Sequence, residues 1–141
     1  MADITASTDF RNLLADAAAA LYFWATLHGT GGSTLAVGDT YTAGVDGELA
    51  TGNGYTRGAK TVDYTHATAN GLLTAANAVW TASGGSIGPA SYGACWVSAT
   101  NDIATAKLLW VDDMSASPQT ATDGNTMTLT IGQNITIPTP A

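Results

Sequence analysis

The stretch that most constrains the fold runs from residue 92 to residue 112, YGACWVSATNDIATAKLLWVD. It holds two apolar runs that alternate with period two on either side of a polar break at residues 100–102. One face of these runs carries Tyr92, Ala94, Trp96 and Ser98, and then Ala106, Leu108, Trp110 and Asp112. Alternation around a turn signal predicts a β-hairpin, and two tryptophans on its facing strands predict a large hydrophobic anchor.

Other segments also have the character of strands. Residues 21–28 are dense in aromatic side chains and predict a buried strand. Residues 126–131 alternate clearly, with Met127, Leu129 and Ile131 expected to face inward and the threonines between them outward. Weaker strand candidates are residues 40–42, residues 55–62 with a continuation to 68, residues 78–82, and residues 135–137. Residues 72–81 also have helical composition, so their secondary structure stays ambiguous.

One helix is expected over residues 9–20. Apolar side chains recur there at helical spacing, and polar ones occupy the opposite face, as in an amphipathic helix laid across a sheet. The apolar positions are Phe10, Leu13, Leu14, Ala17 and Leu21, and the polar ones are Arg11, Asn12 and Asp16. Residues 29–33 and 115–121 are expected to be loops. Residues 35–50 form a long segment rich in Gly, Asp and Thr, of a kind that is often functional or ordered by a partner.

The predicted fold class is therefore mainly β, with a single β-sandwich or jelly-roll-like domain and one N-terminal α-helix. The 141 residues form one domain, with a polar lead at residues 1–8 and a tail at residues 138–141. The single cysteine excludes an internal disulfide. Only 11% of the residues are charged, and the abundance of Thr, Ala, Gly and Ser indicates a surface suited to contact with other proteins and to homo-oligomerisation.

The charge balance argues against nucleic acid and anionic membranes as partners. The net charge is −7, and the only cations are Arg11, Arg57, Lys60 and Lys107, too few to neutralise phosphates. No apolar run approaches the length of a membrane span, and no signal peptide is visible. We therefore expect synthesis and assembly in a cytoplasm.

No residue pattern indicates catalysis or a metal site. His28 and His66 have neither the HxH nor the HExxH spacing, so we expect a structural hydrogen bond for His28 at a strand end and a surface position for His66. Cys95 has no nearby cation and reads as a buried, inert thiol. Asp112 and Asp113 would point to opposite faces of a strand, which does not suit a paired-carboxylate site. We expect no enzyme activity and no cofactor.

The order of the segments resembles the small tailed-phage virion proteins often described as tail-fibre-like. Their usual pattern is a Leu-His-Thr-x-x-Pro-Gly run followed by a Gly-Tyr-x-Arg element and a β-rich C-terminal half. Residues 27–32, LHGTGG, match the first part loosely and lack the proline, whereas Gly54, Tyr55 and Arg57 match the second part. The likeness covers most of the chain in order.

The resemblance implies a non-enzymatic virion protein made in the host cytoplasm. The favoured expectation is a capsid decoration (cement) protein that binds the major capsid protein and stabilises the assembled lattice. Such proteins are homo-oligomers and often trimers, and the choice between a trimer and a dimer stays open. The alternative is a tail or tail-fibre component, including a carbohydrate-binding module for host recognition. The interface residues we expect are His28, Tyr55 and Arg57, together with the loop between residues 29 and 49. An ordinary strand-surface position for Arg57 stays equally open.

Overall fold

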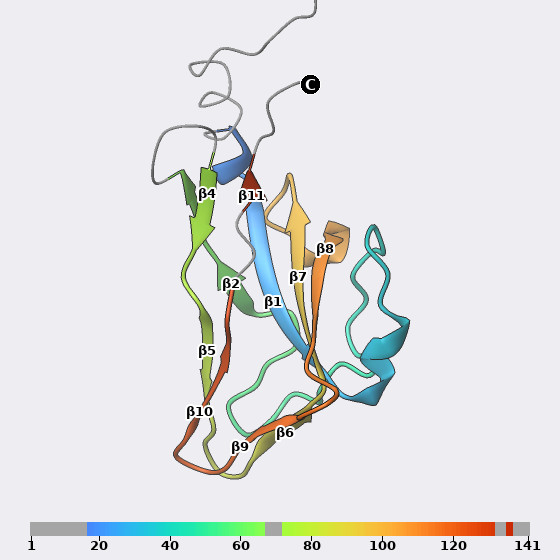
Figure 1. The fold of residues 1–141 in the computed structure, drawn as a ribbon, viewed down its shortest axis with the longest axis vertical. Coiled ribbons are helices and arrows are strands. Elements are labelled where there is room, and N and C mark those ends of the chain that lie inside the picture. Colours follow the sequence, from blue (N-terminus) through green and yellow to red (C-terminus); the bar gives the residue numbers. More distant parts are fainter. Residues whose placement is uncertain (1–16, 67–71, 132–134, 137–141) are drawn as a thin grey trace, which may run out of the picture.

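The computed structural model describes residues 17–66, 72–131 and 135–136, and it is mainly β, as predicted. The described secondary structure consists of short strands, two 3-10 helices and a helical turn at residues 17–19 (Figure 1). In chain order the elements are β1 (Tyr22–His28), η1 (Thr30–Thr34), β2 (Lys60–Val62), β3 (Tyr64–His66), β4 (Leu72–Ala75), β5 (Ala78–Thr81), β6 (Ile87–Ala90), β7 (Tyr92–Ser98), η2 (Ile103–Thr105), β8 (Lys107–Asp113), β9 (Gln119–Ala121), β10 (Thr126–Leu129) and β11 (Ile135–Thr136).

The strands form a sandwich-like arrangement of antiparallel sheets. The main sheet has the order β2-β1-β7-β8, with every neighbouring pair antiparallel. Opposite it lie a three-stranded sheet, β11-β4-β3, and a two-stranded sheet, β10-β5, while β6 and β9 pair at one end of the molecule (Figure 1). Period-two alternation along β1 and β7 gives the main sheet two apolar faces, each of which requires a cover.

The first face of the main sheet builds the larger core. Phe23 and Leu27 of β1 pack there with Leu73 of β4, Trp80 of β5 and Leu129 of β10, all of which are buried. Met127, Leu129 and Ile131 point inward, whereas the threonines between them are exposed, which confirms the alternation predicted for residues 126–131. Burying large apolar side chains between layers supplies the main driving force for this fold.

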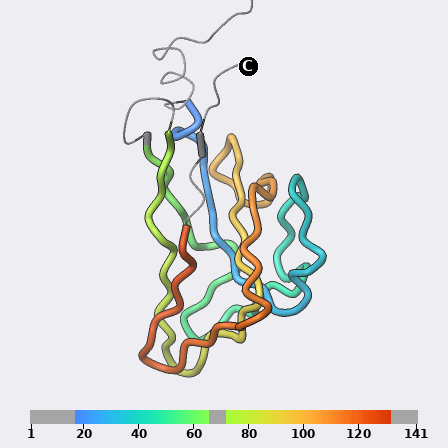
Figure 2. Tube along the Cα trace, in the orientation of Figure 1, coloured from blue at the N-terminus to red at the C-terminus, as the bar shows by residue number. Residues whose placement is uncertain are grey.

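The second face is covered by the segment between β1 and β2, residues 29–59, which we call the excursion. Its Tyr41 packs edge-on against Trp96 of β7, with ring centroids 5.2 Å apart, in a smaller core that also contains Trp24 and Leu108. Figure 2 shows that the excursion leaves one end of β1 and passes alongside β8, an edge strand of the main sheet. The excursion is therefore a layer of the fold. Main-chain hydrogen bonds fasten it to β8, from the Gly38 N–H to the Leu108 carbonyl, and to the residue before β8, from the Tyr41 N–H to the Ala106 carbonyl.

The predicted hairpin forms as β7 and β8, but its two tryptophans do not share one cluster. Trp96 lies opposite Leu108, whereas Cys95 lies opposite Trp110, because a register shift places Leu109 as an extra residue in β8. A β-bulge of this kind reverses the direction of the side chains beyond it. Trp96 therefore belongs to the smaller core under the excursion, and Trp110 packs against the larger one.

The predictions for the first half of the chain need three corrections. Residues 29–33 were expected to be loop, but Thr30–Thr34 forms the 3-10 helix η1. The strand expected over residues 55–62 contains only Lys60–Val62, because two turns precede it. Residues 52–55 are closed by reciprocal hydrogen bonds between Gly52 and Tyr55, and residues 56–59 by the Ala59 N–H and the Thr56 carbonyl. In the 40–42 candidate only Thr40 makes a bridge, to Lys107. Of the predicted helix, the described part is helical over residues 17–19, and the rest lies outside the described residues.

A further correction concerns the pair β6 and β9. The predicted loop at residues 115–121 includes strand β9, which pairs with β6. Neither strand shows a clear alternating pattern, and Gly88 and Pro89 in β6 are usual turn residues. The ambiguous residues 72–81 are two strands, β4 and β5, and β11 confirms a short final strand at Ile135–Thr136.

Candidate functional site

Glu48 is the centre of a polar cluster between the excursion and β1. It is the only glutamate in the chain and is 4% exposed. Its Oε1 accepts hydrogen bonds from the Tyr41 and Tyr55 hydroxyls at 3.1 and 3.0 Å, and its Oε2 accepts from Tyr41 at 2.9 Å and from the Gly44 main-chain N–H at 2.8 Å. A buried carboxylate is tolerated where donors surround it in this way, because each one replaces a lost bond to water.

Tyr55 links this cluster directly to the main sheet. Its hydroxyl accepts a hydrogen bond from the Leu27 main-chain N–H at 3.1 Å while donating to Glu48, and only 2% of the residue is exposed. Burial, followed by the nearby Glu48 carboxylate, raises the pKa of Tyr41 well above its ordinary value, and burial is also the main cause of the raised pKa of Tyr55. Both hydroxyls therefore stay protonated at neutral pH and act as permanent donors to Glu48.

Arg57 ties down the backbone of the excursion rather than the Glu48 carboxylate. Its Nε donates to the Leu49 carbonyl at 3.0 Å and its Nη2 to the Glu48 carbonyl at 3.1 Å. The guanidinium also lies so close to Gly44 that a Cβ there would stand 2.8 Å from Nη1. The Tyr55 and Arg57 side chains of the Gly-Tyr-x-Arg element thus close the turn that holds residues 44–57 together.

His28 belongs to a second chain of hydrogen bonds beside the first. The Trp96 indole N–H donates to the Thr26 hydroxyl at 2.7 Å, and that hydroxyl is 2.7 Å from His28 Nε2. His28 Nδ1 lies 3.0 Å from the Asp46 carbonyl, which can only accept, so Nδ1 carries the proton and Nε2 accepts from Thr26. A neutral imidazole satisfies every contact, and burial lowers the pKa of His28 below its ordinary value against the opposing effects of Asp46 and Glu48.

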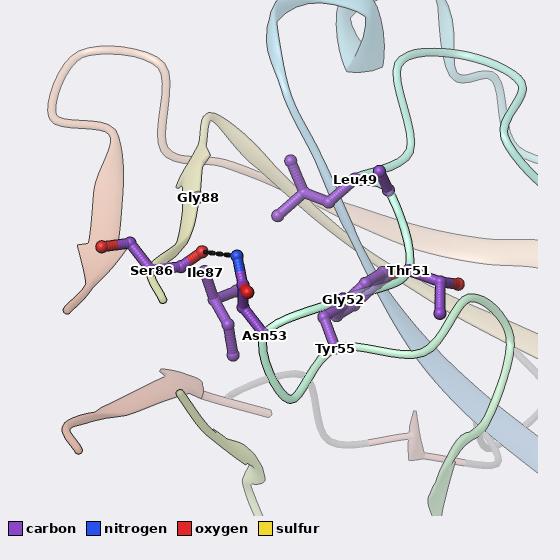
Figure 3. Close-up of a pocket in the computed structure, with 9 residues that line it drawn as sticks. Leu49, Thr51, Gly52, Asn53, Tyr55, Ser86, Ile87 and Gly88 are labelled. Atoms are coloured by element: carbon purple, nitrogen blue, oxygen red, sulfur yellow. Dashed lines mark hydrogen bonds between the residues drawn. The ribbon is translucent and has the colours of Figure 1, made fainter. Parts of the chain in front are cut away.

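The neighbouring hollow in Figure 3 offers no titratable side chain other than the Tyr55 phenol. It has a volume of about 210 Å³ and lies between residues 49–55 and the start of β6, where Asn53 Nδ2 donates to the Ser86 carbonyl at 3.1 Å. Its lining residues are Leu49, Ala50, Thr51, Gly52, Asn53, Tyr55, Ser86, Ile87 and Gly88. The hollow therefore lacks the acid–base pair that hydrolytic or transfer chemistry requires.

The remaining reactive groups do not assemble into a site. Cys95 is fully buried, and burial raises its thiol pKa to about 12, which confirms the prediction of an inert thiol. Within residues 17–66, 72–131 and 135–136, no three His, Cys, Asp or Glu side chains lie close enough to hold a metal ion. The His66 side chain lies outside what the structure describes.

All three residues expected at an interface converge on Glu48. His28 pairs with Glu48 through a β-bridge, Tyr55 binds its carboxylate, and Arg57 binds its carbonyl. Because His28 is 1% exposed and Tyr55 2%, neither side chain offers a surface of its own, and both hold the excursion in place. Glu48 itself was missed by the sequence reasoning, although a lone glutamate in a charge-poor, Gly-rich stretch was the signal that could have found it.

The buried neutral His28 predicts a loss of stability in mildly acidic solution. The unfolded chain takes up a proton on this residue near pH 6.5, whereas the folded chain resists it, so the free energy of unfolding should fall as the pH drops below about 6.5. The limiting slope is about 1.4 kcal/mol per pH unit for one proton. Urea unfolding at several pH values between about 8 and about 5, which bracket the ordinary histidine pKa, measures this slope.

A pair of variants identifies the responsible histidine. The His28→Gln variant should lose this pH dependence, while the His66→Gln variant should keep it. An unchanged slope in His28→Gln would contradict the hydrogen-bond arrangement described for His28.

Comparisons with protein-family models, with curated proteins and with solved structures found no match to this chain. No helix in the described part of the chain is long and apolar enough to cross a membrane.

Proposed function

We propose that this chain is a non-enzymatic structural protein of a phage particle, and within that class a capsid decoration protein that stabilises the assembled shell. The observation that carries the proposal is the use of the polar side chains in the excursion. The hydrogen bonds of five polar side chains hold a long loop on a β-sheet: Glu48, Tyr41, Tyr55, Arg57 and His28. A loop that folding has already ordered loses little further conformational entropy when a partner docks on it.

The outer surface supports the same proposal. Exposed valines occupy turns of the excursion, with Val37 75% and Val45 47% exposed, in a chain of which only 11% is charged. A charge-depleted surface with apolar side chains on rigid turns suits contact with a protein lattice better than it suits a free monomer. The excursion would bury these turns against capsid subunits and against sister copies of the chain.

The carbohydrate-binding alternative receives less support from the geometry. Stacking on sugar rings needs open aromatic faces, but Trp24, Trp80 and Trp96 are at most 5% exposed. Trp110 is half-buried, and its indole N–H donates to the Tyr64 hydroxyl at 3.0 Å. Among the described aromatic side chains, only Tyr22 is exposed, at 43%. We therefore favour the decoration role over a glycan-binding fibre module.

The test is whether the chain is part of a particle and where it lies. Particles purified from cells that make this chain should contain it at an abundance comparable to that of the major capsid protein, with density on the outer shell. Shells stripped of the chain should release their contents at a lower temperature, and adding back the purified protein should restore the resistance. Absence from the particle, or a few copies confined to a tail or fibre, would overturn the proposal.

A further inference from the structure

The described residues do not cover the second face of the main sheet along its whole length. The side chains that β1 places on this face are Tyr22, Trp24, Thr26 and His28, and their exposed fractions are 43%, 5%, 0% and 1% in that order. The excursion leaves β1 after His28 (Figure 1), and the exposed fraction rises from 5% at Trp24 to 43% at Tyr22, so the cover by described residues thins out at the start of the strand. An apolar strand face therefore becomes accessible at the start of β1.

A hollow of about 230 Å³ lies at this open end. It is lined by Leu21, Tyr22, Phe23, Trp24, Thr61, Val62, Asp63 and Asn101. Strand β2 pairs with β1 only from Phe23 to Ala25, so the β2 side of Tyr22 has no strand beside it in the described residues. Leu21 is 37% exposed and the Tyr22 ring stacks on Trp24, with centroids 6.4 Å apart. An exposed aromatic ring on a rigid base beside a hollow is a typical anchor point of a protein interface.

Three polar side chains around the hollow are available to bind a partner molecule. Within the described part of the chain, the Tyr22 hydroxyl, the Asp63 carboxylate and the Asn101 amide have no hydrogen-bond or ion-pair partner. Asp63 and Asn101 are exposed, so the hollow combines an aromatic face with an unpaired anion at its rim. An arginine side chain matches both features, because it stacks on an aromatic ring and binds a carboxylate through two N–H groups.

From this arrangement we infer that the open end of the second face, at Tyr22, Asp63 and Asn101, binds a segment of a different protein that presents an arginine flanked by apolar residues. The net charge of −7 favours a basic segment over an acidic one. The inference does not depend on the virion assignment, because it names only the chemistry of the partner.

A second copy of this chain is a poorer occupant than a different protein. The three described cations are already engaged inside the chain: Arg57 binds main-chain carbonyls, Lys107 binds the Thr40 hydroxyl, and Lys60 lies 5.5 Å from the centre of the Trp80 ring. The fourth, Arg11, lies outside the described residues. Self-association through this hollow would therefore have to break one of these contacts or use Arg11.

Two matched peptides test the inference with the purified protein. The first is acetyl-Leu-Arg-Leu-amide, and the second replaces arginine with citrulline, which keeps the shape and removes the charge. In nitrogen–proton NMR titrations of the full chain, the arginine peptide should shift the amide signals of Tyr22, Asp63 and Asn101 saturably. The citrulline peptide should bind about tenfold more weakly, since it lacks the ionic contact with Asp63.

Two variants and one control locate the site. Asp63→Asn should remove the preference for the arginine peptide, and Tyr22→Ala should weaken both peptides. Asp123→Asn, which removes an exposed charge at a distant turn, should leave both affinities unchanged. The inference is wrong if neither peptide shifts these signals, if both bind equally, or if the shifts spread over all the acidic residues. Concentration-dependent shifts of the same signals without peptide would identify a second copy as the occupant and also overturn it.

Discussion

Replacing Glu48 with alanine should lower the free energy of unfolding by about 3–5 kcal/mol. The change removes the acceptor of the buried Tyr41 and Tyr55 hydroxyl protons and of the half-buried Gly44 N–H. Each unsatisfied buried donor costs about 1–3 kcal/mol, and the three share one cavity, so the costs will not add fully. Urea unfolding followed by tryptophan fluorescence measures the loss.

The Glu48→Gln variant is the matched control for this prediction. Glutamine keeps the volume and one acceptor oxygen, so we expect a cost of about 1–2 kcal/mol. A double-mutant cycle with Tyr41→Phe should show coupling between the two sites, because Tyr41 donates to both oxygens of Glu48. Equal stability of Glu48→Ala and the unaltered protein would show that the cluster does not hold the excursion to the sheet.

A second large effect is expected at Gly54, the first residue of the Gly-Tyr-x-Arg element. A Cβ at this position would stand 2.0 Å from the Thr81 carbonyl oxygen, and the backbone has a φ of +94°. Gly54→Ala must therefore push the turn away from β5 in addition to straining the left-handed backbone. We expect a loss of about 4 kcal/mol in the free energy of unfolding, from overpacking and backbone strain together.

A matched variant at Gly38 separates the backbone strain from the overpacking. Its φ is +93°, nearly the value at Gly54, but a Cβ there would meet nothing within 4 Å. Gly38→Ala should therefore cost only the backbone strain, about 1–2 kcal/mol. The difference between the two variants isolates the contact with Thr81, and comparable losses would show that this contact is easily relieved.

Local pattern accounts for the elements whose side chains alternate strongly. The two arms of the hairpin and residues 126–131 were predictable from period-two alternation, and residues 21–28 from a dense run of aromatic side chains that is buried on both faces of the sheet. β6 and β9 were not predictable, since Gly88 and Pro89 carry turn character and their pairing is made by residues about 30 positions apart. The Leu109 bulge likewise depends on which of two faces each tryptophan fills.

The candidate site shows the same division more sharply. His28, Tyr55 and Arg57 could be singled out because they stand in the two short stretches that resemble the phage pattern, residues 27–32 and 54–57. Their common partner Glu48 could not be placed, because it meets Tyr55 and His28 only after the excursion folds back on β1. The sequence by itself determined a mainly β chain with an aromatic core and a long Gly-rich excursion. Only the tertiary structure decided that the excursion is a packed layer with its polar groups turned inward, and that Tyr22, Asp63 and Asn101 stay uncovered. The physical reason is that hydrophobic periodicity is written in neighbouring residues, whereas a buried hydrogen-bond network and an open sheet end depend on segments that meet across the fold.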